Sequence, residues 1–349
     1  MKNPILGVTM GDPAGVGPEI IVRAGAEPEV QRTSRPVVIG AAATLGEALA
    51  LVGSPLRLHS VTQVAECRWQ PGTLEVLDLA NVDMATLPRA RVSAAAGRAA
   101  YEYIEMAVAL AKAGAIDGIV TAPINKEALA AAGMTHSGHT EILASLSGTR
   151  DFAMLLMGHE LRVIHVTTHV ALRRVPDLVT RDRVLRTIQL AQRTLEGLGI
   201  PRGRIAVAGL NPHAGEDGLF GDEEKTAIVP AIEAARGEGL NVAGPLPADT
   251  LFSRARGGEF DIVVAMYHDQ GHIPVKTLGF NYDETTKRWV GLSGVNVTVG
   301  LPFLRVSVDH GTAFDRAWKG IANHESMVEA LHVAVRMLSA PGARRSSSS

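Results

Sequence analysis

The stretch VVAMYHDQGHIPVK, residues 263–276, places a polar segment directly after a short apolar run. The run has the length and composition of a strand that is buried on both faces of a parallel sheet. The polar segment contains His268, Asp269, His272 and Lys276, which can bind protons, metals or anions. Ligands of open α/β sheets bind beyond the carboxyl ends of the strands. This stretch therefore favours an α/β fold with a site at a strand end.

The rest of the chain repeats this alternation of short apolar runs and longer helical patterns. We predict strands over Ile5–Thr9, Pro36–Ile39, Gly118–Thr121, Ala153–Met157, Leu161–Val166, Ile205–Ala208, Ile262–Met266, Val295–Val299 and Leu304–Val308. We predict helices over Ala94–Ala113, Arg181–Gly197, Glu223–Arg236 and Ser326–Leu338. Such alternation is typical of a mostly parallel sheet covered on both faces. The polar segment Asn281–Leu292 is expected to form a surface hairpin or an inserted loop.

Composition narrows the class of protein. The 349 residues include 46% hydrophobic and 20% charged residues with a net charge of −2, which is typical of a globular protein and does not favour nucleic-acid binding. Cys67 is the only cysteine, so an intrachain disulfide is impossible. The N-terminal residues lack a signal-peptide pattern, and we expect a cytoplasmic protein. Residues 341–349, PGARRSSSS, are expected to form a disordered tail.

Three histidines follow three of the predicted strands. LRVIHVTTH ends at His169, RIAVAGLNPH ends at His213, and DIVVAMYH ends at His268. Three imidazoles at one edge of a sheet suit a divalent metal with open positions for water or substrate. Asp249 and Asp269 could accept hydrogen bonds from these imidazoles and fix their tautomers. The alternative is three unrelated structural histidines. We assign His165 to a strand and His272 to the turn, outside the ligand set.

Other polar residues suggest an anion site. GHTE, residues 138–141, precedes a helical run, so His139 and Thr140 would lie at a positive helix N-terminus, although a plain capping motif has the same sequence. Lys276, Asn296 and Arg305 each lie near a strand end and offer charge and donors to an anionic substrate. Taken singly, each of these residues is more often an ordinary surface residue.

Two glycine-containing loops are candidates for binding or for simple turns. GDPAGVGPE, residues 11–19, opens a helix after the first strand, but Ile20 stands where a Rossmann fingerprint needs its third glycine. A Walker A loop is excluded because no Gly-Lys-Ser/Thr follows. DHGTAFDRAWKGIANHE, residues 309–325, could wrap a nucleotide or serve as an ordinary connection.

Several long motifs together resemble the PdxA family, the 4-hydroxythreonine-4-phosphate dehydrogenases of vitamin B6 biosynthesis. The similar segments extend from the first strand to about Gly320: TMGDPAGVGPEI, TAPINKEAL, GHTEIL, TTHVAL, GLNPHAGE, GPLPADTLF, AMYHDQGHIPVK and GVNVTVGLPFLRVSVDHGTA. GDPAGVGPE and HGTAFDRAWKGIAN are also similar to loops of isocitrate and isopropylmalate dehydrogenases, which bind NAD(P) without a Rossmann fingerprint.

The resemblance implies a two-domain α/β/α subunit of the isocitrate/isopropylmalate dehydrogenase type, not a Rossmann fold, in a homodimer with its active site in the cleft. We expect residues 1–130 and 300–340 to form the first domain and residues 131–299 to form the second, which carries the metal ligands. The implied metal ligands are His169, His213 and His268 of the partner subunit. The implied substrate-binding residues are His139, Thr140, Lys276, Asn296 and Arg305. By analogy with the wider superfamily, loop Asp309–Asn323 would bind NAD or NADP through Gly311, Thr312, Ala313, Asp315 and Asn323.

The implied reaction is oxidation of a secondary hydroxyl. A zinc, cobalt or magnesium ion would chelate the hydroxyl, and hydride would pass to the nicotinamide. With 4-hydroxythreonine 4-phosphate the product would be 2-amino-3-oxo-4-phosphooxybutanoate, a 3-oxo acid that readily loses CO₂. Lys276, Asp249 and a metal-bound water are candidates for the proton acceptor.

Three alternatives remain open. INKEALAAAG, LRVIHVTTHVALR and FGDEEKTAIVPA are more similar to the branch of the family that oxidises 4-phospho-D-threonate or 4-phospho-D-erythronate. That branch differs in the C2 substituent, hydroxyl instead of amino. A second alternative is oxidation of a non-phosphorylated cis-diol carboxylate. A third, of another class, is a metal- or ligand-binding homodimer without redox activity.

Overall fold

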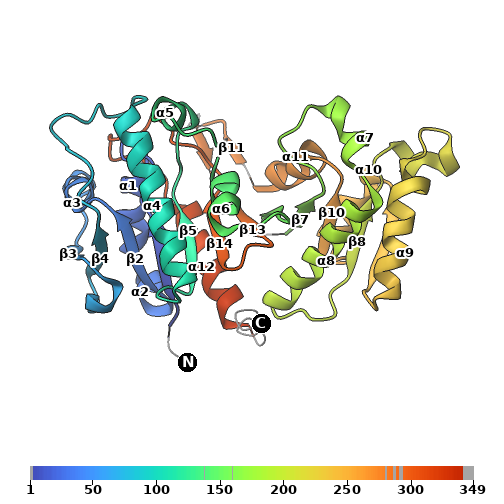
Figure 1. Ribbon diagram of the computed structural model, residues 1–349, viewed down its shortest axis with the longest axis horizontal. Coiled ribbons are helices and arrows are strands. Elements are labelled where there is room, and N and C mark those ends of the chain that lie inside the picture. The colour runs from blue at the N-terminus through green and yellow to red at the C-terminus, as the bar shows by residue number, and fades with distance from the viewer. Residues whose placement is uncertain are drawn as a thin grey trace. The chain divides into compact units, whose positions relative to one another are not determined.

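The computed structural model describes residues 3–340, apart from residues 137, 159, 280, 286–287 and 291–293, and gives only the backbone of residues 281–283 and 288–290. The chain divides into two compact units (Figure 1). Unit 1 comprises Met1–Arg150 and Leu301–Ser339, and unit 2 contains Asp151–Gly300. We expected the second domain to begin at residue 131. Residues 131–150 group with unit 1 instead, because α6 (His139–Ser147) packs against α4 (Ala94–Lys112) of that unit.

Unit 1 is built on a parallel set of strands in the order β3-β4-β2-β1-β5-β14. The strands are β1 (Ile5–Thr9), β2 (Arg35–Gly40), β3 (Arg57–Val61), β4 (Thr73–Asp78), β5 (Gly118–Thr121) and β14 (Leu304–Val308). The interior strand β5, between β1 and β14, is buried along its whole length, as its apolar sequence predicts.

Helices cover both faces of these strands. α4 packs on β1, β2 and β5, whereas α12 (Glu325–Ser339) packs on β5 and β14 and contacts α1 and α2. Right-handed crossovers that run in opposite directions along the sheet place their helices on opposite faces. The remaining helical segments of unit 1 are α1 (Gly17–Gly25), α2 (Pro28–Thr33), α3 (Ala42–Leu51), η1 (Val64–Glu66) and α5 (Lys126–Ala131).

Unit 2 has a mixed set of strands in the order β13-β6-β7-β10-β8-β9. The strands are β6 (Ala153–Met157), β7 (Arg162–His165), β8 (Ile205–Ala208), β9 (Val242–Leu246), β10 (Ile262–Ala265) and β13 (Val295–Val299). The pairs β13/β6 and β6/β7 are antiparallel, and β7, β10, β8 and β9 are parallel. The carboxyl ends of β7, β8 and β10 therefore lie at one edge.

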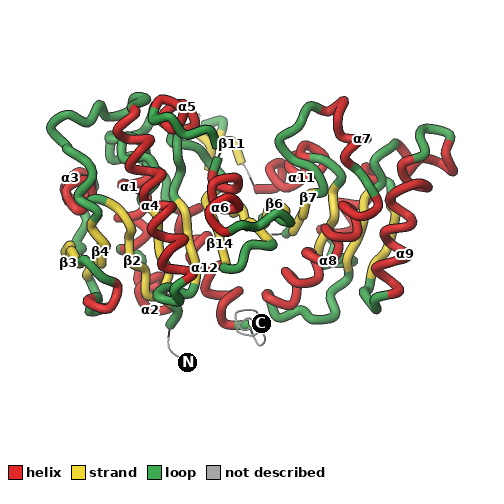
Figure 2. Tube along the Cα trace, in the orientation of Figure 1, coloured by secondary structure: helices red, strands yellow, loops and turns green. Residues whose placement is uncertain are grey.

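The helical segments of unit 2 follow its parallel strands, and the alternation is visible in Figure 2. They are η2 (Leu172–Arg174), α7 (Val175–Leu178), α8 (Arg181–Gly197), η3 (Pro212–Gly218), η4 (Glu224–Ile228), α9 (Val229–Gly237), α10 (Ala248–Arg256) and α11 (His268–Gly279). A buried cluster that includes Val163, Ala206 and Val263 of the central strands, together with Leu251 of α10, forms a core beside the site. Across the part of the chain that the structure describes, no helix is long and apolar enough to cross a membrane.

All the strands predicted from the sequence are present within one residue at either end. The expected hairpin is represented by the antiparallel pair β11 (Asn281–Asp283) and β12 (Arg288–Val290), and Leu292 lies outside the described residues. Strands β3, β4 and β9 were missed. The residues of β3 are mostly exposed or half-buried at a sheet edge, and β9 contains Gly244-Pro245, so neither shows the apolar pattern of a buried strand.

The largest difference concerns residues 268–279. We expected a turn after the strand, but α11 begins at His268 itself and continues past Pro274. The sequence disfavours this helix because Gly271 and Pro274 lie inside it. Packing overrides that preference, since a Cβ at position 271 would collide with the side chains of His165 and Val163. Only glycine lets the helix lie this close to β7.

Candidate functional site

The sheet order of unit 2 brings the three predicted strand ends together. β10 pairs with β7 on one side and with β8 on the other. Figure 1 shows α7, α11 and the segment that leads into α9 at the same end of these strands. His169 follows β7, His213 follows β8 and His268 opens α11 after β10. Topology thus delivers three histidines from distant parts of the chain to one edge, as the spacing predicts.

The structure gathers four histidines beside β7, two of which were outside the predicted ligand set. His268 and His272 lie one helical turn apart, and their rings stack at 3.7 Å between centroids. The ring of His169 lies 5.7 Å from that of His268, and the ring of His165 lies 4.8 Å from that of His272. His272 belongs to α11 and not to a turn, as we had assigned it.

Hydrogen bonds fix the tautomers of the two buried members of this group. Nδ1 of His165 lies 3.0 Å from the carbonyl oxygen of Met154, which can only accept, so Nδ1 carries the proton. Nε2 of His165 can then accept from Nδ1 of His272 at 3.2 Å. Burial lowers the pKa of His165 to about 4 and that of His272 to about 3. Both rings are therefore neutral near pH 7.

Asp269 orients His268, the half-buried member of the group. Nδ1 of His268 donates to Oδ1 of Asp269 at 2.7 Å. This bond leaves the lone pair of Nε2 available to a metal, and a carboxylate partner raises the basicity of the ring. Asp249, the other predicted acceptor, lies exposed in the first turn of α10.

His213 stands apart from the other predicted ligands. It lies in η3, and its ring is 6.2 Å from that of Phe220. Among the residues that the structure describes, no three His, Cys, Asp or Glu side chains are arranged to hold a metal ion. The imidazole chemistry suits a divalent metal, but one chain brings together only His169 and His268 of the predicted set.

A second polar cluster lies in unit 1, at the N-terminus of α6. His139 is the first residue of this helix and Thr140 the second, both half-buried. Arg305 of β14 is 3% exposed and donates to Oγ1 of Thr121 at 2.8 Å. Burial lowers the pKa of Arg305 to about 9, which still leaves a cation at neutral pH, while Glu141 opposes the shift. A buried guanidinium beside a helix N-terminus favours an anion such as phosphate.

His139 is held neutral in this cluster. Burial, and then the charge of Arg305, keep the pKa of His139 well below its usual value. The backbone carbonyl of Ala122 accepts a hydrogen bond from the ring and opposes this shift. A neutral imidazole adds no second positive charge next to Arg305, so an incoming anion would be neutralised mainly by the guanidinium.

Lys276 and Asn296 lie in unit 2. Lys276 follows His272 by one turn of α11, and its charge contributes to the low pKa of that histidine. Asn296 lies half-buried in β13, opposite Leu156 of β6. The predicted substrate-binding residues thus fall into two groups, one in each unit.

The predicted cofactor loop packs against the GDPAGVGPE loop of unit 1. The backbone N–H of Val16 donates to the carbonyl of Thr312 at 3.0 Å, and Nε1 of Trp318 donates to the carbonyl of Pro13 at 3.1 Å. A Cβ at Gly15 would come within 2.9 Å of the Thr312 side chain, so only glycine permits this approach.

Exposure divides the predicted cofactor residues. Gly311 and Asp315 are exposed, Ala313 and Asn323 are half-buried, and Thr312 is buried. Oδ1 of Asn323 accepts from the backbone N–H of Glu325 at 2.8 Å, at the start of α12. Asn323 therefore has a structural bond whether or not it also contacts a cofactor.

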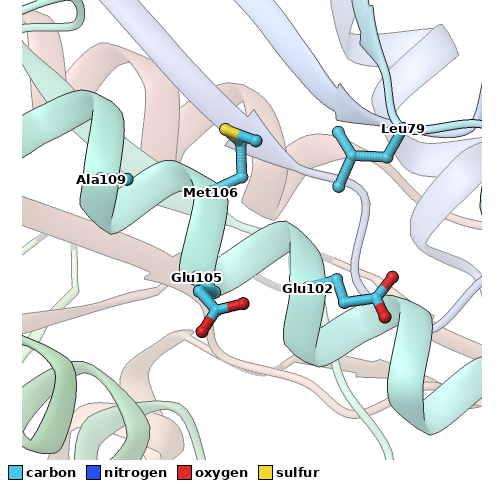
Figure 3. Close-up of a pocket in the computed structure, with 5 residues that line it drawn as sticks. All are labelled: Leu79, Glu102, Glu105, Met106 and Ala109. Atoms are coloured by element: carbon cyan, nitrogen blue, oxygen red, sulfur yellow. The ribbon is translucent and has the colours of Figure 1, made fainter.

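A pocket on α4 lies outside all of these clusters. It is lined by Glu102, Glu105, Met106 and Ala109 of α4 and by Leu79 of a neighbouring segment, all labelled in Figure 3. Glu102 already accepts from Nδ2 of Asn81 at 2.6 Å. None of the predicted site residues lines this pocket.

Comparison with known proteins identifies the family. The model of the family described as "Pyridoxal phosphate biosynthetic protein PdxA" matches residues 32–334. This chain belongs to the PdxA family. It is 52% identical over 329 residues to the D-threonate 4-phosphate dehydrogenase of Cupriavidus necator, covering 94% of this chain and 95% of that one. The enzyme of the same name from Salmonella typhimurium is 48% identical, covering 97% of this chain and 100% of that one.

Solved structures of PdxA dehydrogenases have the same fold. A 4-hydroxythreonine-4-phosphate dehydrogenase from Klebsiella pneumoniae superposes with a TM-score of 0.85 at 48% identity, covering 96% of this chain and 98% of that one. A terephthalate 1,2-cis-dihydrodiol dehydrogenase from Burkholderia xenovorans gives a TM-score of 0.68 at 30% identity, with 96% and 98% covered. The expected isocitrate/isopropylmalate dehydrogenase-like α/β fold, and not a Rossmann fold, is confirmed. The chain is a dehydrogenase of the PdxA family.

One buried group of this PdxA protein was missed from the sequence. Asp12 is 0% exposed, its Oδ1 accepts from the backbone N–H of Ala14 at 2.8 Å, and its Oδ2 has no hydrogen-bond partner among the described residues. Burial raises the pKa of Asp12 to about 6, although the bond from Ala14 opposes the shift. The sequence Asp-Pro-Ala-Gly resembles an ordinary exposed turn, and it gave no signal for this burial.

We expect Asp12→Asn to change the pH dependence of stability. A carboxyl whose pKa is raised on folding stabilises the native state below pH 4, and that contribution is lost as pH rises through about 6. Because folding raises the pKa of Asp12 from 3.8 to about 6, the free energy of unfolding should fall by about 3 kcal/mol over this pH range. Urea unfolding at pH 4.5 and pH 8 should therefore show the variant gaining stability relative to wild type at pH 8. An equal difference at both pH values would contradict a raised pKa.

Proposed function

We propose that this protein is a D-threonate 4-phosphate dehydrogenase, the sugar-acid alternative to the vitamin B6 enzyme. The observation that carries the proposal is about 50% identity, over nearly the full length, to relatives with that name in several bacteria. Our main expectation from the sequence, 4-hydroxythreonine 4-phosphate, has weaker support, although solved relatives carry that name. The proposed reaction oxidises the C3 hydroxyl, and the resulting 3-oxo acid loses CO₂.

The cluster at the N-terminus of α6 supports a phosphorylated substrate. Arg305 keeps its charge in a buried position, which is costly unless an anion or hydrogen bonds compensate it. Thr140 and the first N–H groups of α6 add donors that suit the tetrahedral oxygens of a phosphate. We assign this cluster to the 4-phosphate. Lys276 and Asn296 are then left to contact the carboxylate or the hydroxyls.

The histidines of unit 2 support a metal that activates the hydroxyl. A divalent ion such as zinc, cobalt or magnesium, when bound by His169, His213 and His268, would lower the pKa of the substrate hydroxyl by Lewis acidity. The chain's own contribution is to fix the ligands. Asp269 holds Nδ1 of His268, and the neutral ring of His272, which is hydrogen-bonded to His165, stacks on His268 and holds the plane of its ring. Lys276, one turn beyond His272, is our candidate to accept the hydroxyl proton, a role that requires its neutral amine form.

The nicotinamide cofactor is assigned to the loop of residues 309–323. Its exposed backbone at Gly311 and the carboxylate of Asp315 suit the adenosine end of NAD⁺, because a carboxylate pairs with free ribose hydroxyls and repels a 2′-phosphate. A nicotinamide cofactor held by this loop would accept the hydride from C3 of the substrate, and the hydroxyl proton would pass to the proton acceptor, so that NAD⁺ would be reduced as the substrate is oxidised.

We further propose that the working form is a homodimer. Exposed apolar side chains gather on the segments that follow β7, β8 and β10, the strands that carry the histidines: Val170, Leu172, Leu178, Leu219, Phe220 and Ile273. Apolar groups concentrated in this way are typical of a surface that a second protein covers. Since the described residues of one chain do not bring His213 together with His169 and His268, we propose that a second copy completes the site. The resemblance implies that His268 is the ligand that the second copy supplies.

The deciding experiment follows NADH formation at 340 nm with a divalent metal present. D-threonate 4-phosphate, D-erythronate 4-phosphate, 4-hydroxy-L-threonine 4-phosphate and a non-phosphorylated aromatic cis-dihydrodiol would be compared by kcat/KM. We expect D-threonate 4-phosphate to exceed 4-hydroxythreonine 4-phosphate by roughly 100-fold or more, since a pocket that pairs with a hydroxyl leaves polar groups unsatisfied beside an ammonium. Preference for the amino substrate would restore the vitamin B6 assignment. NAD⁺ binding without turnover of any substrate would favour a redox-inactive binding protein.

A further inference from the structure

The turn that carries His213 has an unusual backbone. His213, Ala214, Gly215, Glu216, Asp217 and Gly218 all have positive φ, with values of 54°, 54°, 79°, 39°, 57° and 92°. Residues with a side chain disfavour this left-handed region, and a run of them persists only when surrounding contacts hold it. The question is which contacts hold this run.

A buried carboxylate holds the base of the turn. Glu224 is 4% exposed, and its Oε1 accepts from the backbone N–H groups of Leu210 and Asn211, both at 2.8 Å. Its Oε2 accepts from Nδ2 of Asn211 at 2.9 Å. Three donors from the chain just before His213 therefore converge on one negative group. Hydrogen bonds to a buried charge are the strong ones, and they are costly to leave unmade.

Two glycines bring the turn into direct contact with this carboxylate. A Cβ at Gly215 would come within 2.7 Å of Oε2 of Glu224, and a Cβ at Gly209 would come within 2.7 Å of the Cα of Ala214. The end of β8, the turn and Glu224 are thus packed together with no room for a side chain. Glu224 opens η4, a helical segment with π-type hydrogen bonding, a form that is frequent at functional sites.

Gln270 links the same backbone to the other histidines. Its Nε2 donates to the carbonyl of Gly209 at 2.8 Å, and its Oε1 accepts from the backbone N–H of Met266 at 2.7 Å. The chain from Gly209 to Asn211 is therefore held by Gln270 on one side and by Glu224 on the other. A shift of Glu224 would therefore move the backbone of Leu210 and Asn211 and, with it, His213.

We propose that Glu224 is a positioning residue for His213, which maintains the left-handed turn that presents this imidazole to the metal. The inference rests on the proposed function, in which His213 is a ligand. Glu224 touches neither metal nor substrate in this role and acts through the backbone of Leu210 and Asn211. The neighbouring Glu223 is half-buried and accepts one bond from Nδ2 of Asn211 at 2.7 Å, which makes it a matched control.

The test uses the full-length protein, stripped of metal and titrated with Zn²⁺ alone in competition with a chromophoric chelator. Glu224→Gln replaces an acceptor oxygen with an amide that meets the amide donor of Asn211. We expect the Zn²⁺ affinity to fall by roughly 10- to 100-fold, the usual effect of losing a group that orients a ligand. Glu223→Gln should change it by less than about 3-fold. The KM for NAD⁺ should stay within about 2-fold of wild type in both variants, because the loop assigned to NAD⁺ lies in unit 1.

A second substitution separates positioning from general folding. Glu216 is exposed at φ 39°, so Glu216→Gly removes the conformational penalty without removing a packed side chain. Added to Glu224→Gln, it should recover part of the Zn²⁺ affinity. If the carboxylate of Glu224 only stabilised the fold, Glu224→Gln would lower the melting temperature of the metal-free protein. Adding Glu216→Gly would then leave the Zn²⁺ affinity as low as in Glu224→Gln alone.

The outcomes distinguish this inference from the proposed function. An unchanged Zn²⁺ affinity in folded Glu224→Gln overturns the positioning role, provided that His213→Ala loses affinity. If His213→Ala binds Zn²⁺ as wild type does, the three-histidine site itself is wrong. Should Glu224→Gln fail to fold, Asn211→Ala removes only one donor. The Zn²⁺ affinity of Asn211→Ala is then expected to fall by roughly 3- to 10-fold. An unchanged affinity in this variant would overturn the proposal.

Discussion

Under the proposed function, replacing His268 with alanine is expected to lower kcat by on the order of 10³-fold or more, because the variant would lose a ligand to the metal ion that would stabilise the developing alkoxide. The variant should purify with less metal, measured by mass spectrometry of the digested protein. It should melt close to wild type, since the side chain is surface-accessible and is held by one stacked ring and one carboxylate. His332→Ala on α12, far along the chain, is the control for loss of a histidine.

The same variant tests whether the site is shared between subunits. If His268 serves the partner's site, mixing inactive His268→Ala and His213→Ala proteins should restore activity. Half of the randomly paired dimers would be mixed and each would hold one intact site, so about a quarter of wild-type activity is expected. No recovery after subunit exchange, verified by labelled subunits, would contradict a shared site. Full turnover by His268→Ala alone would exclude it as a ligand.

Replacing Arg305 with methionine is expected to lower kcat/KM for the phosphorylated substrate by roughly 100- to 1000-fold, the cost of removing one partner of a buried charge pair. Most of the effect should appear in KM, because the phosphate is held equally in the ground and transition states. Arg305→Lys keeps the charge but loses the planar fork of donors, so an intermediate loss is expected.

Although Arg305→Met should lose catalytic efficiency, its thermal stability should not fall and should even increase. A guanidinium that is 3% exposed is costly to desolvate, and an apolar side chain of similar length removes that cost. The melting temperature of ligand-free Arg305→Met should therefore equal or exceed that of wild type. Inorganic phosphate should raise the melting temperature of wild type and of the surface control Arg254→Met, but not that of Arg305→Met. Equal protection of all three proteins would place the phosphate elsewhere.

Strand positions were predictable because their physical requirement is local. A strand buried between two layers of helices needs a continuous apolar run, and β5, β8 and β10 each show one. The edge strand β3 has no such requirement. Its exposed and half-buried residues do not form an apolar run, so the sequence did not predict it. The location of His169, His213 and His268 at one edge followed from the same runs, since parallel neighbours end at the same side.

Contacts between distant segments were not predictable from the sequence. The residues next to Asp12 in the sequence do not indicate that it is buried, because its burial depends on packing around β1. The contact of His165 with His272, which stacks on His268, requires α11 to lie against β7, and the sequence HDQGHIPVK disfavours the helix that makes this contact.

By itself, the sequence determined the α/β class and the strands, and it placed the candidate site histidines after strands that end at one edge of the sheet, because buried strands and strand-end histidines can be recognised from apolar runs and their spacing. The tertiary structure decided which groups share an environment. It buried Arg305 beside His139 and placed Glu224 under the left-handed turn of His213. Protonation, tautomer and backbone strain all depend on such neighbours, and residues far apart in the chain become neighbours only through packing.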